Sequence, residues 1–242
     1  MEKLGLLTGL LLVAGLTFAQ VTKLEETTVE PPKFVGQQIM DSDEEMTSSP
    51  ICYYLKNNLQ SQNYSEEGVV TVLFTINPDG TLSNFTVKNS VDATNDNAVL
   101  NCLKSTSGLW QAGRVNGTPV EMEKEIYVHF VNPSTTSLEE LAQENIMAAI
   151  NKVETAKNVK NSIRLSAEKA NKKATRKLHS ALYYLDEATK YQPEEASIIF
   201  WQACAYDELG NEIRRAEKLN QFMEMVDLQY QAQVESVSIF LN

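Results

Sequence analysis

Residues 68–76 read Gly-Val-Val-Thr-Val-Leu-Phe-Thr-Ile and run directly into Asn77-Pro78-Asp79-Gly80. In the first segment the bulkier apolar residues alternate with smaller or polar ones, a period of two that is typical of a strand with one core-facing side. In the second segment proline presets the backbone for a turn and glycine accepts a positive φ. The two together predict a strand that reverses into a hairpin. The side chains expected to face the core are Val70, Val72, Phe74 and Ile76.

The residues around this hairpin predict two helices and a closing strand. Upstream, 50–59 places apolar residues four apart and begins with a proline after Ser49, a plausible N-cap. Downstream, 96–109 reads as a second helix that stops at a glycine, and Trp110 is expected to pack that helix against the sheet. A further turn at 116–117 leads into the apolar strand 126–131. This order of elements predicts an α+β domain.

Residues 138–242 are expected to be helical. No glycine or proline occurs from Leu138 to Gln192, and apolar residues thin out between about Asn158 and Lys173, where a break is predicted. Ala181 and Ala216 are 35 residues apart, one more than the period of about 34 in tetratricopeptide repeats, which this region resembles. Three uses of such a unit stay open: packing on the sheet domain, which is favoured, pairing with a second copy of the chain, and peptide binding in its groove.

The N-terminus carries the pattern of a secretory signal peptide. Lys3 precedes a run of apolar and small residues over 4–18, and small residues surround Ala19. The run is shorter than the roughly 20 residues that span a bilayer, so cleavage after Ala19 is predicted, with a linker over 20–30. The protein is therefore expected to be exported. The alternative is retention of 4–18 as an inner-membrane anchor.

Charge and composition argue against several classes of function. The net charge of −11 disfavours nucleic acid and leaves contact with membranes peripheral at most. Residues 152–177, however, include nine basic residues and only two acidic ones. This composition predicts a solvated helix face, and a basic docking surface is the alternative. No glycine-rich phosphate loop, nucleophile elbow or HExxH motif occurs, and the two histidines are far apart in sequence. We therefore expect no enzyme, cofactor or metal site.

Three cysteines become relevant if the chain is exported, because exported spaces are oxidising. Cys52 and Cys102 flank the first strand pair and both fall in predicted helices, so they are the candidates for a disulfide. Cys204 would then remain free. Buried free thiols are the alternative for the same pair.

Residues 31–132 resemble the C-terminal domain of the TonB family of periplasmic energy transducers, in variants from Bacteroidetes-type bacteria. No single piece is specific, but the pieces occur in the family's order. They are Pro31-Pro32-Lys33-Phe34, Gly68–Phe74, Asn77-Pro78-Asp79-Gly80, Val87–Ser90, Asn97-Ala98, Trp110 with Gly113, and Asn116-Gly117-Thr118-Pro119-Val120 before the closing strand. The chain departs from the family at Tyr64-Ser65 and Trp110-Gln111-Ala112-Gly113, and it shows no long proline-rich spacer.

The resemblance implies a small three-stranded antiparallel sheet backed by two helices, followed here by the all-α helical-repeat region. It also implies a periplasmic protein that supports transmembrane transport. The edge of its final strand would pair with a peptide of an outer-membrane receptor. The residues that would contact the peptide are Glu123, Glu125, Tyr127, His129 and Val131. A purely structural edge, protected by its charges, is the alternative. In that case the protein would be a scaffold. His129, on the polar face of this strand, is predicted to be a solvated surface residue rather than a ligand.

Overall fold

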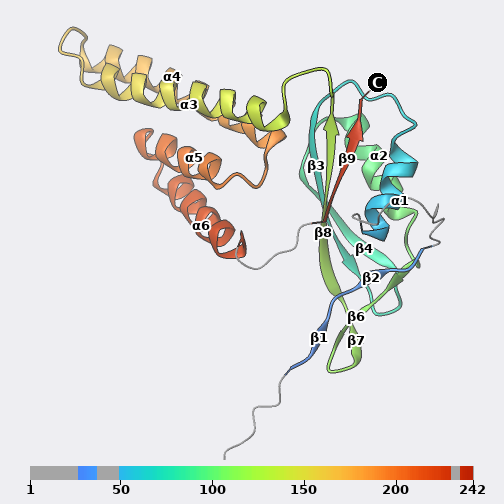
Figure 1. Ribbon diagram of the computed structural model, residues 1–242. Helices are drawn as coiled ribbons and strands as arrows, with labels where there is room; N and C mark the ends of the chain where they lie inside the picture. The colour runs from blue at the N-terminus through green and yellow to red at the C-terminus, as the bar shows by residue number, and fades with distance from the viewer. Residues whose placement is uncertain (1–26, 37–48, 230–234, 242) are drawn as a thin grey trace, which may run out of the picture.

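The computed structural model describes residues 27–36, 49–229 and 235–241, and these form a sheet-based part and a helical part (Figure 1). The expected signal peptide or anchor, and the linker as far as residue 26, lie outside the described residues. Within the described part of the chain, no helix combines the length and apolarity that crossing a membrane requires.

The main sheet has four strands in the order β4-β3-β8-β9. The first three, β3 (Gly68–Ile76), β4 (Leu82–Asn89) and β8 (Met122–Val131), are antiparallel neighbours, as expected. The fourth, β9 (Glu235–Phe240), comes from the far end of the chain and runs parallel to β8. The prediction of a three-stranded sheet was therefore wrong. The prediction that 138–242 are helical was also wrong at its C-terminal end, where β9 lies.

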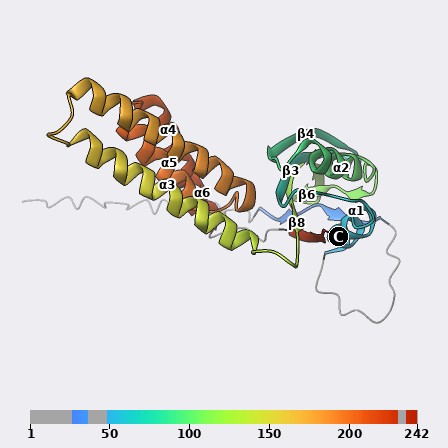
Figure 2. The ribbon, with the colours of Figure 1, turned by 90° about the horizontal axis from the view of Figure 1, so that it is seen from above.

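Helices α1 (Pro50–Leu59) and α2 (Ala93–Lys104) cover one face of this sheet (Figures 1 and 2). α1 has the predicted bounds. α2 begins three residues before the predicted start, because the side chain of Asp92 accepts hydrogen bonds from the amides of Thr94 and Asn95 and so caps the helix there. The core between helices and sheet includes the four predicted strand residues. Its other large members are Ile51, Leu55, Leu59, Tyr64, Val99, Leu103, Trp110, Ile126, Val128, Phe130, Val237 and Ile239.

The predicted hairpin turn and the predicted position of Trp110 are both confirmed. The amide of Gly80 donates to the carbonyl of Asn77 at 2.9 Å, and Gly80 has a φ of 80°. Trp110 is buried, lies edge-on to Phe34 and Phe74, and donates from Nε1 to the hydroxyl of Thr106 just after α2. The indole therefore joins the end of the helix to the sheet.

Two small sheets extend this core. β1 (Val29–Glu30) pairs with β6 (Gly113–Val115), which forms a hairpin with β7 (Thr118–Val120). β2 (Lys33–Phe34) pairs with β5 (Trp110–Gln111). The end of the expected linker is therefore held in strand pairing.

The helical part consists of α3 (Leu138–Lys160), α4 (Ala167–Tyr191), α5 (Ala196–Glu208) and α6 (Glu212–Gln229). The turn between α3 and α4 falls inside the predicted break. Ala181 is fully buried in the core of this part, as a small residue at a helix crossing should be, whereas Ala216 is exposed on α6. The second position of the expected repeat thus lacks the packing that a stacked repeat would give it.

The helical part packs on the sheet face opposite α1 and α2. Val69, Tyr127 and Leu138 form a small buried cluster at this contact, and Lys190 of α4 forms an ion pair with Glu66 at 3.2 Å. At this contact Val69 of β3 is buried on the face opposite the main core. β3 is buried along nearly its whole length, although its sequence alternates in bulk.

Candidate protein-binding edge of the sheet

Strand β8 has a partner on each side, but the second partner covers only part of it. On one side β3 pairs with its whole length except Val131, from Met122 opposite Ile76 to Phe130 opposite Gly68. On the other side β9 pairs only from Ile126 onward. Of the described strands, none pairs with 122–125 on the side of β9. Among the described residues, the edge that was expected to be open is therefore closed by β9 over its last six residues, and its first four have no described strand beside them.

Strand β9 is held by its buried side chains and by polar contacts near both ends. Val237 and Ile239 insert into the main core and are 7% and 0% exposed. At one end Glu235 forms an ion pair with Lys124 at 3.0 Å. At the other end the side-chain amide of Gln60 donates to the carbonyl of Phe240 at 3.0 Å and accepts from its amide at 3.4 Å. β9 thus behaves as a strand added to the edge of β8 by its own chain.

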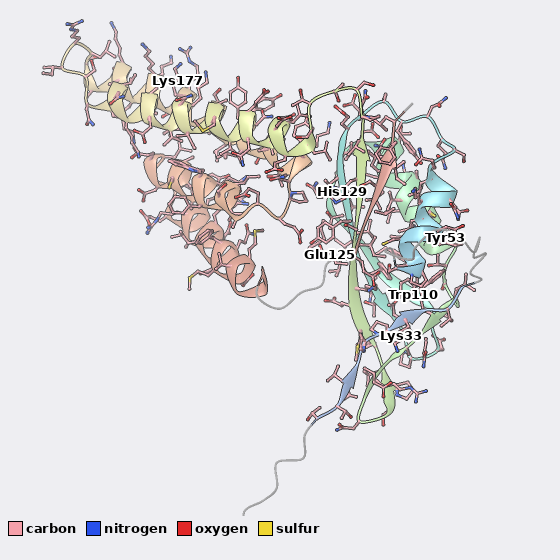
Figure 3. All side chains as sticks on the ribbon, viewed as in Figure 1. Lys33, Tyr53, Trp110, Glu125, His129 and Lys177 are labelled. Atoms are coloured by element: carbon pink, nitrogen blue, oxygen red, sulfur yellow. The ribbon has the colours of Figure 1, made fainter. Side chains whose placement is uncertain are left out.

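The five residues expected to contact a partner do share one face of β8, but that face looks toward the helical part (Figure 3). Glu123 is exposed and Glu125 is half-buried. Tyr127 is only 9% exposed, and Val131 packs against the same interface cluster. Side-chain contact with a partner is therefore open at the two glutamates and restricted at Tyr127, His129 and Val131.

A groove of about 600 Å³ lies between the sheet and the helical part. Tyr127 and His129 line it from β8, Tyr191 from α4, and the carboxylates of Glu67, Glu139, Glu194 and Glu195 surround it. Burial raises the pKa of Tyr127, and the nearby Glu125 and Glu194 carboxylates raise it further. The phenol therefore stays protonated and serves as a hydrogen-bond donor to the glutamates around it.

His129 is half-buried in this groove rather than solvated, and burial lowers its pKa below the ordinary value of 6.5. The unfolded chain then binds the proton more readily than the folded chain, so the free energy of unfolding should fall as the pH drops through about 6.5 toward the folded-state value. Urea unfolding between about pH 5 and 7.5 should show this slope, and His129→Gln should flatten it. The exposed His179→Gln serves as the control; an equal flattening in both variants would contradict the assignment to His129.

The opposite edge of the sheet is poorly suited to accept another strand. β4 pairs with β3 through two register irregularities, and Asn84 within it has a positive φ of 53°. Such bulges and an exposed Lys88 are devices that discourage edge-to-edge pairing. The β8 side is therefore the better candidate for strand addition.

The cysteines are free in the structure. Cys52 is buried in α1, and Cys102 and Cys204 are half-buried. No bridge joins Cys52 and Cys102 in this structure, and their pairing in an oxidising space stays a prediction. Burial raises the pKa of Cys102 to about 11, which keeps it a protonated, weakly reactive thiol. Among the described residues, no group of three or more His, Cys, Asp or Glu side chains is arranged to hold a metal ion.

Strand β9 was the functional element that sequence reasoning missed. Its signal is the alternation of Val237 and Ile239 with serines, a period of two carried by β-branched residues. Six residues with that pattern are easily absorbed into a preceding helical assignment. Their strand state depends on the edge of β8, which lies more than a hundred positions away in sequence.

Fold and edge together define a small α+β domain with a helical part attached. A family model described as the C-terminal domain of the Gram-negative bacterial TonB protein matches residues 60–131, less than a third of the 242 residues. Neither the search of curated proteins nor that of solved structures gave a match. The matched family is a non-enzymatic interaction domain, and the match runs from the end of α1 to the last residue of β8.

Proposed function

We propose that this protein is an exported, periplasmic TonB-like protein that binds protein partners by strand addition at the edge of β8. The observation that supports this most is the family match, which ends with β8 at Val131. Proteins with this domain bind partners such as outer-membrane receptors, so the proposed role is support of transport across the outer membrane. The helical region, which resembles tetratricopeptide repeats, is a second surface for other periplasmic proteins or a second copy of the chain.

The segment 122–125 is where a partner strand would first pair. Its backbone groups on the β9 side have no described strand opposite them, and main-chain hydrogen bonds provide the affinity in strand addition. Glu123 and Glu125 alternate along this segment, so a partner with lysine or arginine at matching positions is favoured. To pair further along β8, the partner must take the place of β9.

The contacts of β9 favour a second candidate function. Its two buried side chains and its bonds to Lys124 and Gln60 are those of a permanent structural strand. On this proposal the edge is closed for stability, and the protein is a periplasmic scaffold that works through its helical surface without receptor coupling.

A peptide titration followed by NMR distinguishes the two. The probes are synthetic peptides from the N-terminal plug segments of outer-membrane receptors encoded in the same genome. We expect shifts concentrated on Glu123–Val131. Gln60→Ala removes the bonds to Phe240 and should tighten binding about three- to tenfold, because it weakens the competing strand by about 1 kcal/mol.

Gln62→Ala is the matched control, since Gln62 is exposed and no side-chain hydrogen bond joins it to another described residue. It should bind like the unmodified protein. If no peptide shifts β8 in any of the three proteins, receptor coupling is excluded for the peptides tested and the scaffold is supported.

A further inference from the structure

The outer end of the α3–α4 hairpin carries a basic surface that the strand edge does not explain. We call it the basic tip and define it by Arg164, Lys169, Lys172, Lys173, Arg176 and Lys177. The hairpin projects away from the sheet, and these residues lie on its connecting turn and the outer half of α4 (Figures 1 and 3). The tip therefore lies at the far end of the hairpin, where a large partner can reach it.

The cations of the tip are aligned by the helix. Lys169, Lys172, Lys173, Arg176 and Lys177 follow the spacing i, i+3, i+4, i+7, i+8, which places them on one side of α4. The buried side of the same turns consists of Ala170, Ala174 and Leu178, which pack toward the helical core. The segment is thus amphipathic, and its charged stripe faces outward.

These charges have no acidic partners among the described residues. Other basic side chains of the helical part, such as Lys157, Lys160 and Lys190, pair with glutamates at 2.9 to 3.2 Å. No ion pair of this kind joins any of the six tip residues to the part of the chain that the structure describes. In a protein with a net charge of −11, this leaves a concentrated, uncompensated positive field at one end.

An exposed apolar side chain stands at the apex of the same tip. Ile163 is 102% exposed, the highest value among the large apolar residues described, and Arg164 follows it directly. Leu165 is half-exposed two positions later. A fully exposed isoleucine on a turn costs solubility without contributing to the fold, and beside basic residues it is typical of segments that enter a lipid headgroup region.

We propose that the basic tip docks on an anionic phospholipid surface, with its cations on the headgroup phosphates and Ile163 at the boundary with the acyl chains. The charge of the tip is complementary to such a surface, while the acidic remainder of the chain is repelled from it. Residues 152–177 contain no aromatic side chain for stacking on nucleic acid bases, and the tip is convex.

Vesicle co-sedimentation tests this proposal. The protein should begin at Gln20, which keeps every described residue and removes the apolar run that would itself bind lipid. We expect binding to phosphatidylcholine vesicles that contain about 30 mol% phosphatidylglycerol, a decrease with added salt, and little binding to phosphatidylcholine alone. Replacing Lys172, Lys173, Arg176 and Lys177 with glutamine should weaken partitioning by more than about tenfold, since each basic residue near the surface contributes up to about fivefold.

Two further variants complete the test. One asks whether binding depends on the tip rather than on the net charge of the protein, and the other asks whether Ile163 contributes in addition to the charges. The control replaces Lys33, Lys56, Lys88 and Lys104, exposed residues of the sheet part, with glutamine and changes the net charge equally. It should bind nearly as well as the unmodified protein. Ile163→Ser leaves the charge unchanged and should weaken binding about threefold or more. Glutamine preserves helix propensity, and circular dichroism would verify folding.

Three results would overturn the proposal: equal binding to neutral and anionic vesicles, equal losses in the tip and control variants, and binding to soluble polyglutamate without binding to vesicles. The last would point to an acidic protein as the partner of the tip. None of these three results concerns the edge of β8. Failure of the lipid-docking proposal would therefore leave the proposed function unchanged.

Discussion

Ile239→Asp should release β9 from the sheet and lower the free energy of unfolding by about 3–4 kcal/mol. Ile239 is 0% exposed and packs in the main core, where a carboxylate has no partner. The strand detaches rather than bury the charge, so the loss equals the contribution of β9 to the fold. Urea denaturation at constant pH measures it.

Ser238→Asp is the matched control, because Ser238 is the neighbouring residue on the exposed side of the same strand. It adds the same charge and should lower stability by less than about 1 kcal/mol. Equal losses in the two variants would show that β9 is not docked through its buried face.

The released edge can be probed directly. A synthetic peptide of residues 235–242 should bind the Ile239→Asp protein, with shifts on Ile126–Val131, and should not bind the unmodified protein, whose own strand occupies the edge. Binding in trans would establish that the edge of β8 accepts an added strand, which is the physical requirement of the proposed function.

Gly80→Ala should lower the free energy of unfolding by more than about 3 kcal/mol, through two separate effects. Gly80 has a φ of 80°, in the left-handed region that disfavours a side chain. A Cβ at this position would also overlap the backbone carbonyl oxygen of Trp110, so the turn and the strand that carries Trp110 must move apart. Urea denaturation and tryptophan fluorescence report the two consequences.

Gly117→Ala isolates the first effect, the backbone strain. Gly117 has nearly the same φ, 78°, but no atom lies within 4 Å of an added Cβ. The Gly117→Ala variant should lose only about 1–2 kcal/mol in free energy of unfolding, which is the cost of the backbone strain. Equal costs at both positions would mean that the approach of Gly80 to Trp110 does not contribute to stability.

Local patterns were sufficient to predict the elements whose signals lie within a few residues. The alternation in β3, the turn at Asn77–Gly80 and the bounds of α1 all arise from side-chain period and backbone preference, which neighbouring residues set among themselves. The end of α2 was misplaced because 105–108 continue as turns rather than helix, which the spacing of apolar residues does not distinguish.

The candidate site was located by sequence but not described correctly by it. The five residues of β8 do alternate on one face, as their spacing requires. Their accessibility was wrong for Tyr127 and His129, because a face with polar side chains was taken to be solvated, whereas the helical part covers it. Burial of a polar face depends on a contact between distant segments, and no local pattern encodes that contact.

The sequence by itself determined the hairpin, the helices and the strand β8 with its alternating faces, because each depends on interactions over a few residues. Only the tertiary structure decided what happens at the edge of β8. Strand β9 reaches it from more than a hundred residues away and closes 126–131, while no described strand pairs with 122–125 on that side. A strand edge is satisfied by whatever backbone comes beside it, so which segment pairs there is determined by the folded arrangement of the whole chain.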